Sequence, residues 1–156
     1  MKKTAIAVAL ALVSLSAPAA DSIGTTDTGA PDFRAIERLL NTSDPDARRR
    51  LMEAIGAMDA YARKASPKPD ELVILGRAYL RAMGQAGSFR AGELATKALK
   101  LDPKHGAGHL LLAELAAYAR CASCAEESLA NARAVGVDEA SIAAIEGFTY
   151  LSLIHI

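Results

Sequence analysis

The chain has 156 residues, enough for one modest domain, and its 18 basic residues are balanced by 18 acidic ones. No excess of positive charge is present to serve as a nucleic-acid surface, so we expect no nucleic-acid partner. Hydrophobic residues make up 51% of the chain, but aromatic residues only 4%, and Trp is absent. A core of alanine and leucine with few rings suits closely packed helices better than a β-sandwich or barrel. We therefore expect an all-α fold.

Residues 1–20 have the organisation of a secretory signal peptide. Lys2 and Lys3 provide a basic start, residues 5–13 are small and apolar, and residues 17–20 offer a cleavage site. A membrane anchor is the alternative, but the apolar run is shorter than the ~20 residues that a span needs. The opening Met-Lys-Lys-Thr-Ala-Ile-Ala resembles the signal peptide of an enterobacterial outer-membrane protein. This resemblance implies a bacterial periplasmic or secreted protein without a stable membrane span after cleavage.

Residues 21–31 are mostly Asp, Ser, Gly, Thr, Ala and Pro, a composition typical of a flexible linker. The segment 32–68 then predicts two N-terminal helices, the first running to about Leu40. For the second we expect Asp44 as N-cap, Pro45 in the first turn and an end near Lys64. These helices form either a degenerate repeat or an N-terminal cap.

A spacing of large and small residues recurs between residues 69 and 150. Its first copy reads Leu-x2-Leu-Gly-x2-Tyr and ends in a proline, and its positions return 37 and then 34 residues later. The residues that carry the spacing are Leu72, Leu75, Gly76, Tyr79, Ala91, Ala98, Pro103, Ala113, Ala125, Ala132, Gly147 and Tyr150. The small residues allow two helices to approach closely, and Leu75 and Tyr79 fill the space between turns. A generic bundle rich in Ala and Leu is the alternative.

This pattern resembles the tetratricopeptide repeat, and the three extra residues in the stretch 84–88 are also similar to Sel1-like repeats. The resemblance implies a right-handed α-solenoid of antiparallel helix pairs with about two and a half repeats. It also implies a concave face that binds a protein or peptide partner through the first helix of each repeat. The positions carried over to that face are Val73, Arg77, Leu80, Arg81, Leu110, Glu114, Ala117, Tyr118 and Phe148. Arg77 and Arg81 lie one turn apart, where they either bind an acidic group or are simply solvated.

The motif Cys121-Ala-Ser-Cys124 is the most promising one chemically, and the repeat register places it in a turn before a helix. Three interpretations stay open: a local disulfide or semi-buried thiols, a redox-active pair, and a metal site with His105 and His109. The metal site is disfavoured because a continuous helix would place His109 and Cys121 about 18 Å apart. His109 more plausibly fills an inner position of the repeat.

No catalytic set, phosphate-binding glycine loop or cofactor motif is recognisable, and the basic run 48–50 is typical of a solvated helix face. We therefore expect a non-enzymatic scaffold. The resemblance implies a role in pilus or secretion assembly, cytochrome maturation or envelope maintenance. The alternatives are a thiol-disulfide factor using Cys121 and Cys124, or the repeat portion of a larger enzyme. Residues 151–156 can be encoded by a sequencing-adapter end, so we expect a non-native tail and a truncated chain.

Overall fold

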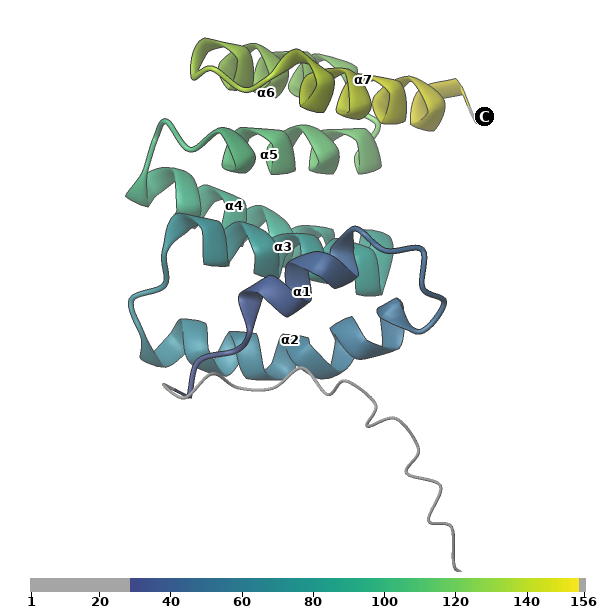
Figure 1. The fold of residues 1–156 in the computed structure, drawn as a ribbon. Coiled ribbons are helices and arrows are strands. Elements are labelled where there is room, and N and C mark those ends of the chain that lie inside the picture. The colour runs from purple at the N-terminus through teal and green to yellow at the C-terminus, as the bar shows by residue number, and fades with distance from the viewer. Residues whose placement is uncertain (1–28, 155–156) are drawn as a thin grey trace, which may run out of the picture.

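The computed structural model describes residues 29–154, which form an all-helical fold without a β-strand (Figure 1). The helices are α1 (Phe33–Leu40), α2 (Ala47–Lys64), α3 (Pro69–Met83), the 3₁₀ helix η1 (Gly84–Gly87), α4 (Ser88–Leu101), α5 (Gly106–Tyr118), α6 (Ala122–Ala134) and α7 (Glu139–Ile154). The all-α class is confirmed for this part of the chain. The predicted signal peptide, most of the linker 21–31 and residues 155–156 lie outside it.

The segment 32–68 holds the two expected helices. The Asp32 carboxylate accepts a hydrogen bond from the Ala35 N–H at 3.1 Å, which caps α1. The start predicted for α2 is two residues too early. Asp44 is not its N-cap, because its carboxylate instead accepts the Asp46 N–H at 2.9 Å in a turn before the helix. The helix proper begins at Ala47 and ends, as expected, at Lys64.

The stretch 84–88, predicted to hold a lengthened turn, is itself partly helical. Helix α3 starts at Pro69, where the missing N–H costs nothing, and the Glu71 carboxylate accepts the Lys68 N–H at 2.9 Å. After α3 the chain forms η1 in the stretch where three extra residues were expected. Helix α4 then ends at Leu101, two residues before Pro103.

The last three helices are joined by short turns with the same hydrogen-bond pattern. At the end of α5, Arg120 and Cys121 donate to the carbonyls of Ala117 and Ala116, and Arg120 has a φ of 55°. At the end of α6, Gly136 and Val137 donate to the carbonyls of Arg133 and Ala132, and Gly136 has a φ of 88°. Both are Schellman turns, which require a left-handed residue just after the helix. Helix α7 then runs through residues 151–154, so the first part of the suspected tail continues it.

From α2 onward the helices stack in chain order, with α2 at one end of the molecule and α6 and α7 at the other, and α1 packs against both α2 and α3 (Figure 1). The larger buried cluster contains residues of α1 to α5, among them Ile36, Leu51, Met58, Leu75 and Leu111. A smaller one joins α5, α6 and α7 through Leu110, Leu129 and Ile142. Each fully buried aliphatic side chain of this size stabilises the fold by about 1.5–3 kcal/mol relative to exposure.

The small residues of the repeat are buried wherever another helix covers them. Ala91, Ala98, Ala113, Ala125 and Ala132 are each at most 1% exposed. On α7 the equivalent positions differ: Gly147 is exposed and Tyr150 is 68% exposed. No helix within residues 29–154 packs over that face of α7. None of the helices in the same range is both long and apolar enough to cross a membrane.

Candidate functional site: a groove across alternate helices

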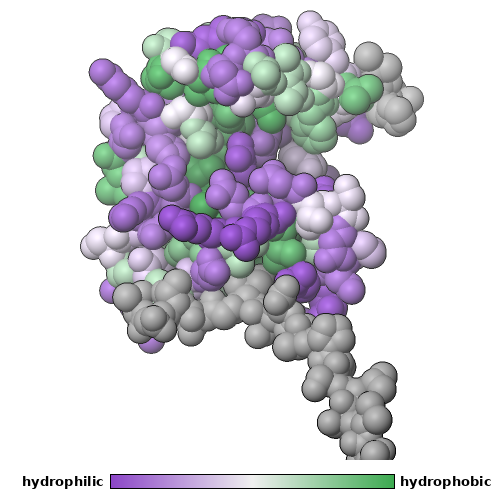
Figure 2. Space-filling model, viewed as in Figure 1, coloured by the Kyte–Doolittle hydropathy of each residue, from purple (hydrophilic) through white to green (hydrophobic). Residues whose placement is uncertain are grey.

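A groove of about 830 Å³ crosses the molecule and is lined by α1, α3, α5 and α7, the first helix of each pair. Its lining includes seven of the nine residues expected on the concave face: Arg77, Leu80, Arg81, Leu110, Glu114, Tyr118 and Phe148. Figure 2, viewed as in Figure 1, shows apolar residues among hydrophilic ones between α1 and α7. The predicted residues are thus brought together on one surface.

Two of the expected groove residues are placed elsewhere. Val73 is 3% exposed and belongs to the buried cluster that contains Ile36 and Leu39 of α1. Ala117 is 1% exposed on α5, which packs against both α6 and α7. The prediction that these two side chains face a ligand is therefore wrong. The register carried over from the repeat takes no account of how deeply these two side chains are buried.

The groove contains an ion pair that bridges neighbouring helices. An Nη atom of Arg77 on α3 donates to the Glu114 carboxylate on α5 at 3.3 Å. Burial raises the pKa of Glu114 above its usual value, and the Arg77 guanidinium opposes that shift without cancelling it. Arg77 Nε is buried and has no hydrogen-bond partner among the described residues. Arg77 thus already holds one carboxylate of this chain but is not fully satisfied.

Arg81 lies one turn along α3 and is more open. Its guanidinium donates to the carbonyl oxygen of Thr42 in the turn between α1 and α2 at 3.2 Å. That bond is to a neutral acceptor, so the positive charge of Arg81 is not neutralised by it. The side chain is exposed and lines the groove. Of the two arginines, Arg81 is therefore the better placed to meet an anionic group in the groove.

An aromatic contact closes the other side of the groove. The rings of Tyr118 on α5 and Phe148 on α7 lie 5.4 Å apart, centroid to centroid, with planes tilted by 55°. Phe148 remains 38% exposed, so part of its ring is free to contact another molecule. Aromatic rings of this kind bury a large area at low conformational cost when a segment docks on them.

Sequence reasoning missed several lining residues. Those of α7 are Ser141, Ala144 and Ile145, and those of the earlier helices include Glu37 and Ile74. The spacing of Ser141, Ala144, Ile145 and Phe148 is the helical period, so the α7 stripe was readable from the sequence. The contribution of α1 to the groove could not be predicted from the sequence, because the residue spacing alone did not decide how that short helix packs.

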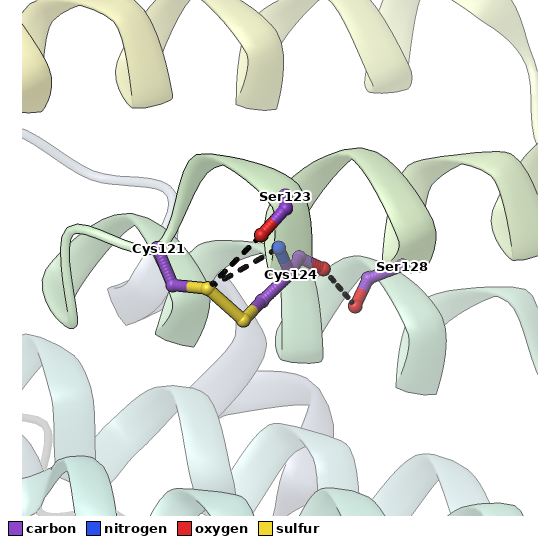
Figure 3. The surroundings of a disulfide bond; sticks show 4 residues. All are labelled: Cys121, Ser123, Cys124 and Ser128. Atoms are coloured by element: carbon purple, nitrogen blue, oxygen red, sulfur yellow. Dashed lines mark hydrogen bonds between the residues drawn. A yellow bond between two sulfur atoms is a disulfide. The ribbon is translucent and has the colours of Figure 1, made fainter.

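The two cysteines form a disulfide at the start of α6, with their Cα atoms 5.3 Å apart (Figure 3). The Cys121 sulfur caps the helix, since it accepts the Cys124 N–H at 3.3 Å. The Ser123 hydroxyl lies 3.7 Å from the same sulfur and must be the donor, because a disulfide sulfur carries no proton. Cys124 is exposed and Cys121 is half-buried.

The histidines are engaged separately. His105 accepts the Gly108 N–H at Nδ1, at 3.2 Å, and its Nε2 contacts the Asp70 carboxylate at 2.8 Å. His109 Nε2 lies 3.0 Å from the carbonyl oxygen of Pro103 and must donate to it. The set of two histidines and two cysteines is therefore not assembled into a metal site. Within residues 29–154 no group of three or more His, Cys, Asp or Glu side chains is placed to hold a metal ion.

The basic run 48–50 is also used within the chain. Arg48 donates through Nε to the Ala82 carbonyl at 2.8 Å, and Arg49 pairs with Asp46 and Glu53 on the surface of α2.

Comparison of the chain with protein-family models, with curated proteins and with solved structures found no match.

Proposed function

We propose that this protein is a non-enzymatic scaffold that binds an extended or helical segment of a protein partner in the groove across α1, α3, α5 and α7. The observation that carries the proposal is the composition of that groove. Alternate helices of the stack line it, and it combines apolar side chains such as Ile74, Leu110 and Phe148 with a few charged ones. A groove of this kind gives area for contact and a small number of polar groups for register.

The repeat supports the same proposal. Pairs α3/α4 and α5/α6 follow one another at the register expected from the sequence, and their alanines are buried between them. We propose that these pairs are tetratricopeptide-like repeats, arranged as a right-handed α-solenoid with α1 and α2 as a divergent first unit. In such an array the second helices form the outer layer, so the first helices remain available to a ligand.

The charges in the groove suggest which segment fits. Arg81 is exposed and has no carboxylate partner within residues 29–154, whereas Glu114 is held by Arg77. A segment that places a carboxylate against Arg81 and an apolar side chain against Phe148 satisfies both ends of the groove. We therefore favour a partner segment with at least one acidic residue beside apolar ones.

A periplasmic or secreted location is part of the proposal. It rests on the signal-like residues 1–20, which lie outside the described part, and it agrees with the Cys121–Cys124 disulfide. Fractionation of cells that express the full chain tests it. Recovery of a shortened protein from the periplasm or medium supports it, and recovery of the full-length chain from the cytoplasm contradicts it.

The binding proposal is tested by selecting peptides from a random library displayed on phage against the purified protein. Arg81→Glu and Phe148→Ala should each weaken the selected peptides at least about tenfold, the effect of losing one contact of about 1.4 kcal/mol. Lys97→Glu on α4 and Tyr150→Ala on α7 are matched controls outside the groove. Equal losses in the controls, with helicity by circular dichroism unchanged in all four, would place binding elsewhere.

A further inference from the structure

The disulfide at the start of α6 is asymmetric in a way that bears on its chemistry. It lies on the surface and outside both buried clusters. The two cysteine residues differ in exposure, and their sulfurs differ in hydrogen bonding. Cys124 is exposed. The Cys121 sulfur accepts the Cys124 N–H at 3.3 Å, and the Ser123 hydroxyl lies 3.7 Å from it (Figure 3).

We propose that Cys121–Cys124 is a thiol–disulfide exchange site, distinct from the groove, that accepts a thiolate at Cys124 and releases Cys121. The sulfur that is attacked must be reachable, and the sulfur that leaves must be able to carry negative charge. Cys124 meets the first requirement. Cys121 meets the second because two donors already point at its sulfur and it caps the N-terminus of a 13-residue helix.

The substrate class is a protein or peptide with two cysteines. Its first thiolate attacks Cys124 Sγ, a bond forms between the two sulfurs, and the electron pair of the Cys121–Cys124 bond moves to Cys121. The second thiolate of the substrate then attacks the substrate's own sulfur in this mixed disulfide and releases Cys124. The substrate dithiol is oxidised by two electrons, the disulfide of this chain is reduced, and the two substrate protons end on Cys121 and Cys124.

The site differs from a structural cross-link in one measurable respect, namely which sulfur forms the mixed disulfide. A purely structural disulfide that reacts only after unfolding should form the mixed disulfide equally at either cysteine. The folded turn should direct the attack to Cys124 by about tenfold, since exchange rates depend on access and on the leaving thiolate. The chain is convenient for this test because trypsin cuts after Arg120 and Arg133 and releases both cysteines in one peptide.

The experiment treats the oxidised full-length protein with reduced glutathione and stops the reaction early with N-ethylmaleimide in acid. Tandem mass spectrometry of peptide 121–133 then locates each group. Glutathione on Cys124 with maleimide on Cys121, and loss of that preference in 8 M urea, supports the proposal. An equal distribution, a preference for Cys121, or reaction only in urea overturns it.

Two serine variants test the assigned role of the hydrogen bonds. Ser123→Ala removes the hydroxyl beside Cys121 Sγ and should slow glutathione attack about fivefold, the effect of one hydrogen bond. Ser128→Ala is the control, because its hydroxyl donates at 2.9 Å to the Cys124 carbonyl and not to sulfur (Figure 3). A rate unchanged in Ser123→Ala, or reduced equally in both variants, contradicts the stabilised departure of Cys121.

Discussion

Gly76 on α3 lies directly against Leu111 on α5, so closely that a Cβ atom placed on Gly76 would be 2.7 Å from Leu111 Cδ2. Leu111 is fully buried and has little room to move. The glycine of the repeat is therefore a steric requirement of packing between successive helix pairs. Gly147, its equivalent on α7, has no atom within 4 Å of the same position.

These two glycines make a matched pair for mutation. Gly76→Ala should lower the free energy of unfolding by about 1 kcal/mol, since overpacking of about 2 kcal/mol exceeds the gain in helix propensity of about 1 kcal/mol. Gly147→Ala should raise it by about 1 kcal/mol, because only the propensity changes. Urea denaturation followed by circular dichroism measures both. Equal stabilisation by the two substitutions would contradict the packing described for α3 and α5.

The two Schellman turns offer a second comparison. Arg120 and Gly136 occupy the same left-handed position after α5 and α6, but only glycine adopts it without steric cost. Arg120→Gly should stabilise the protein by about 0.5–1 kcal/mol, and Gly136→Arg should destabilise it by at least as much. Nothing lies within 4 Å of a Cβ on Gly136, so its cost is conformational. Thermal denaturation that ranks the variants in the opposite order would refute the assigned turns.

A half-buried polar contact joins α2 to α3 and α4. The Asp59 carboxylate accepts hydrogen bonds from the Tyr79 hydroxyl and from Arg90, the latter at 3.2 Å, and its side chain is 15% exposed. Asp59→Ala should cost about 2 kcal/mol, because two donors lose a charged acceptor. Glu53→Ala on the same helix removes only a surface pair with Arg49 and should cost about 0.5 kcal/mol or less. Similar losses in chemical denaturation would argue against a structural role for Asp59.

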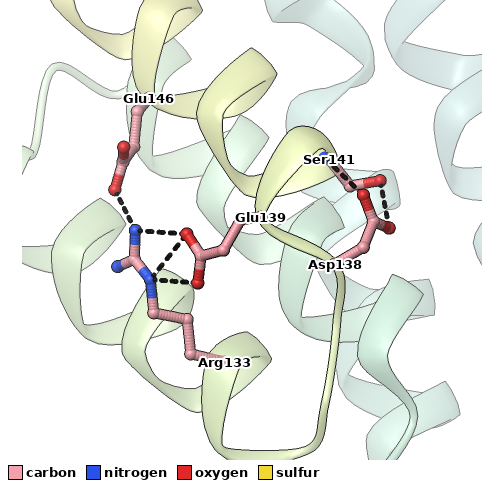
Figure 4. A network of polar contacts seen from close by, with 5 residues as sticks. All are labelled: Arg133, Asp138, Glu139, Ser141 and Glu146. Atoms are coloured by element: carbon pink, nitrogen blue, oxygen red, sulfur yellow. Dashed lines mark hydrogen bonds and ion pairs between the residues drawn. The ribbon is translucent and has the colours of Figure 1, made fainter.

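The start of α7 should make stability depend on pH (Figure 4). Hydrogen bonds from the Ser141 N–H at 2.9 Å and the Ser141 hydroxyl at 2.8 Å lower the pKa of Asp138 below its usual 3.8. A carboxyl group whose pKa is lowered by folding stabilises the fold at pH values above its pKa in the unfolded chain. This contribution disappears as the pH falls through its pKa in the folded protein. The melting temperature of the wild type should exceed that of Asp138→Asn at pH 6. The difference should shrink as the pH falls below 3.8, and a difference that stays as large as at pH 6 would contradict the assignment.

Two ion pairs of Arg133 lie beside this turn. Arg133 on α6 contacts Glu139 at 3.1 Å and Glu146 at 2.7 Å on α7, and these carboxylates raise the pKa of Arg133 (Figure 4). An arginine is charged at every accessible pH, so a higher pKa brings no titration into the measured range. Glu146 stands where the earlier repeats have Leu75 and Leu112. A charged residue is tolerated there because its side chain stays partly exposed and pairs with Arg133 on α6.

Sequence periodicity was sufficient for most of the helices, because small residues such as Ala91 and Ala125 recur where helices must touch. It also placed the extra turn, which the structure fills with η1. It failed where a local contact competes with the regular pattern. Asp44 closes a turn in place of capping α2, and Val73 is buried in the cluster that joins α1 to α5. Neither contact leaves a periodic signal, since each depends on the packing of one short segment.

The central claim is that a partner segment binds across α1, α3, α5 and α7. Amide chemical shifts of the isotope-labelled protein, followed while a selected peptide is added, test this most directly. We predict that the largest changes map to groove residues such as Ile74, Leu110 and Ile145. Changes centred on Thr96 and Lys97 of α4, or on Glu126 of α6, would contradict the claim.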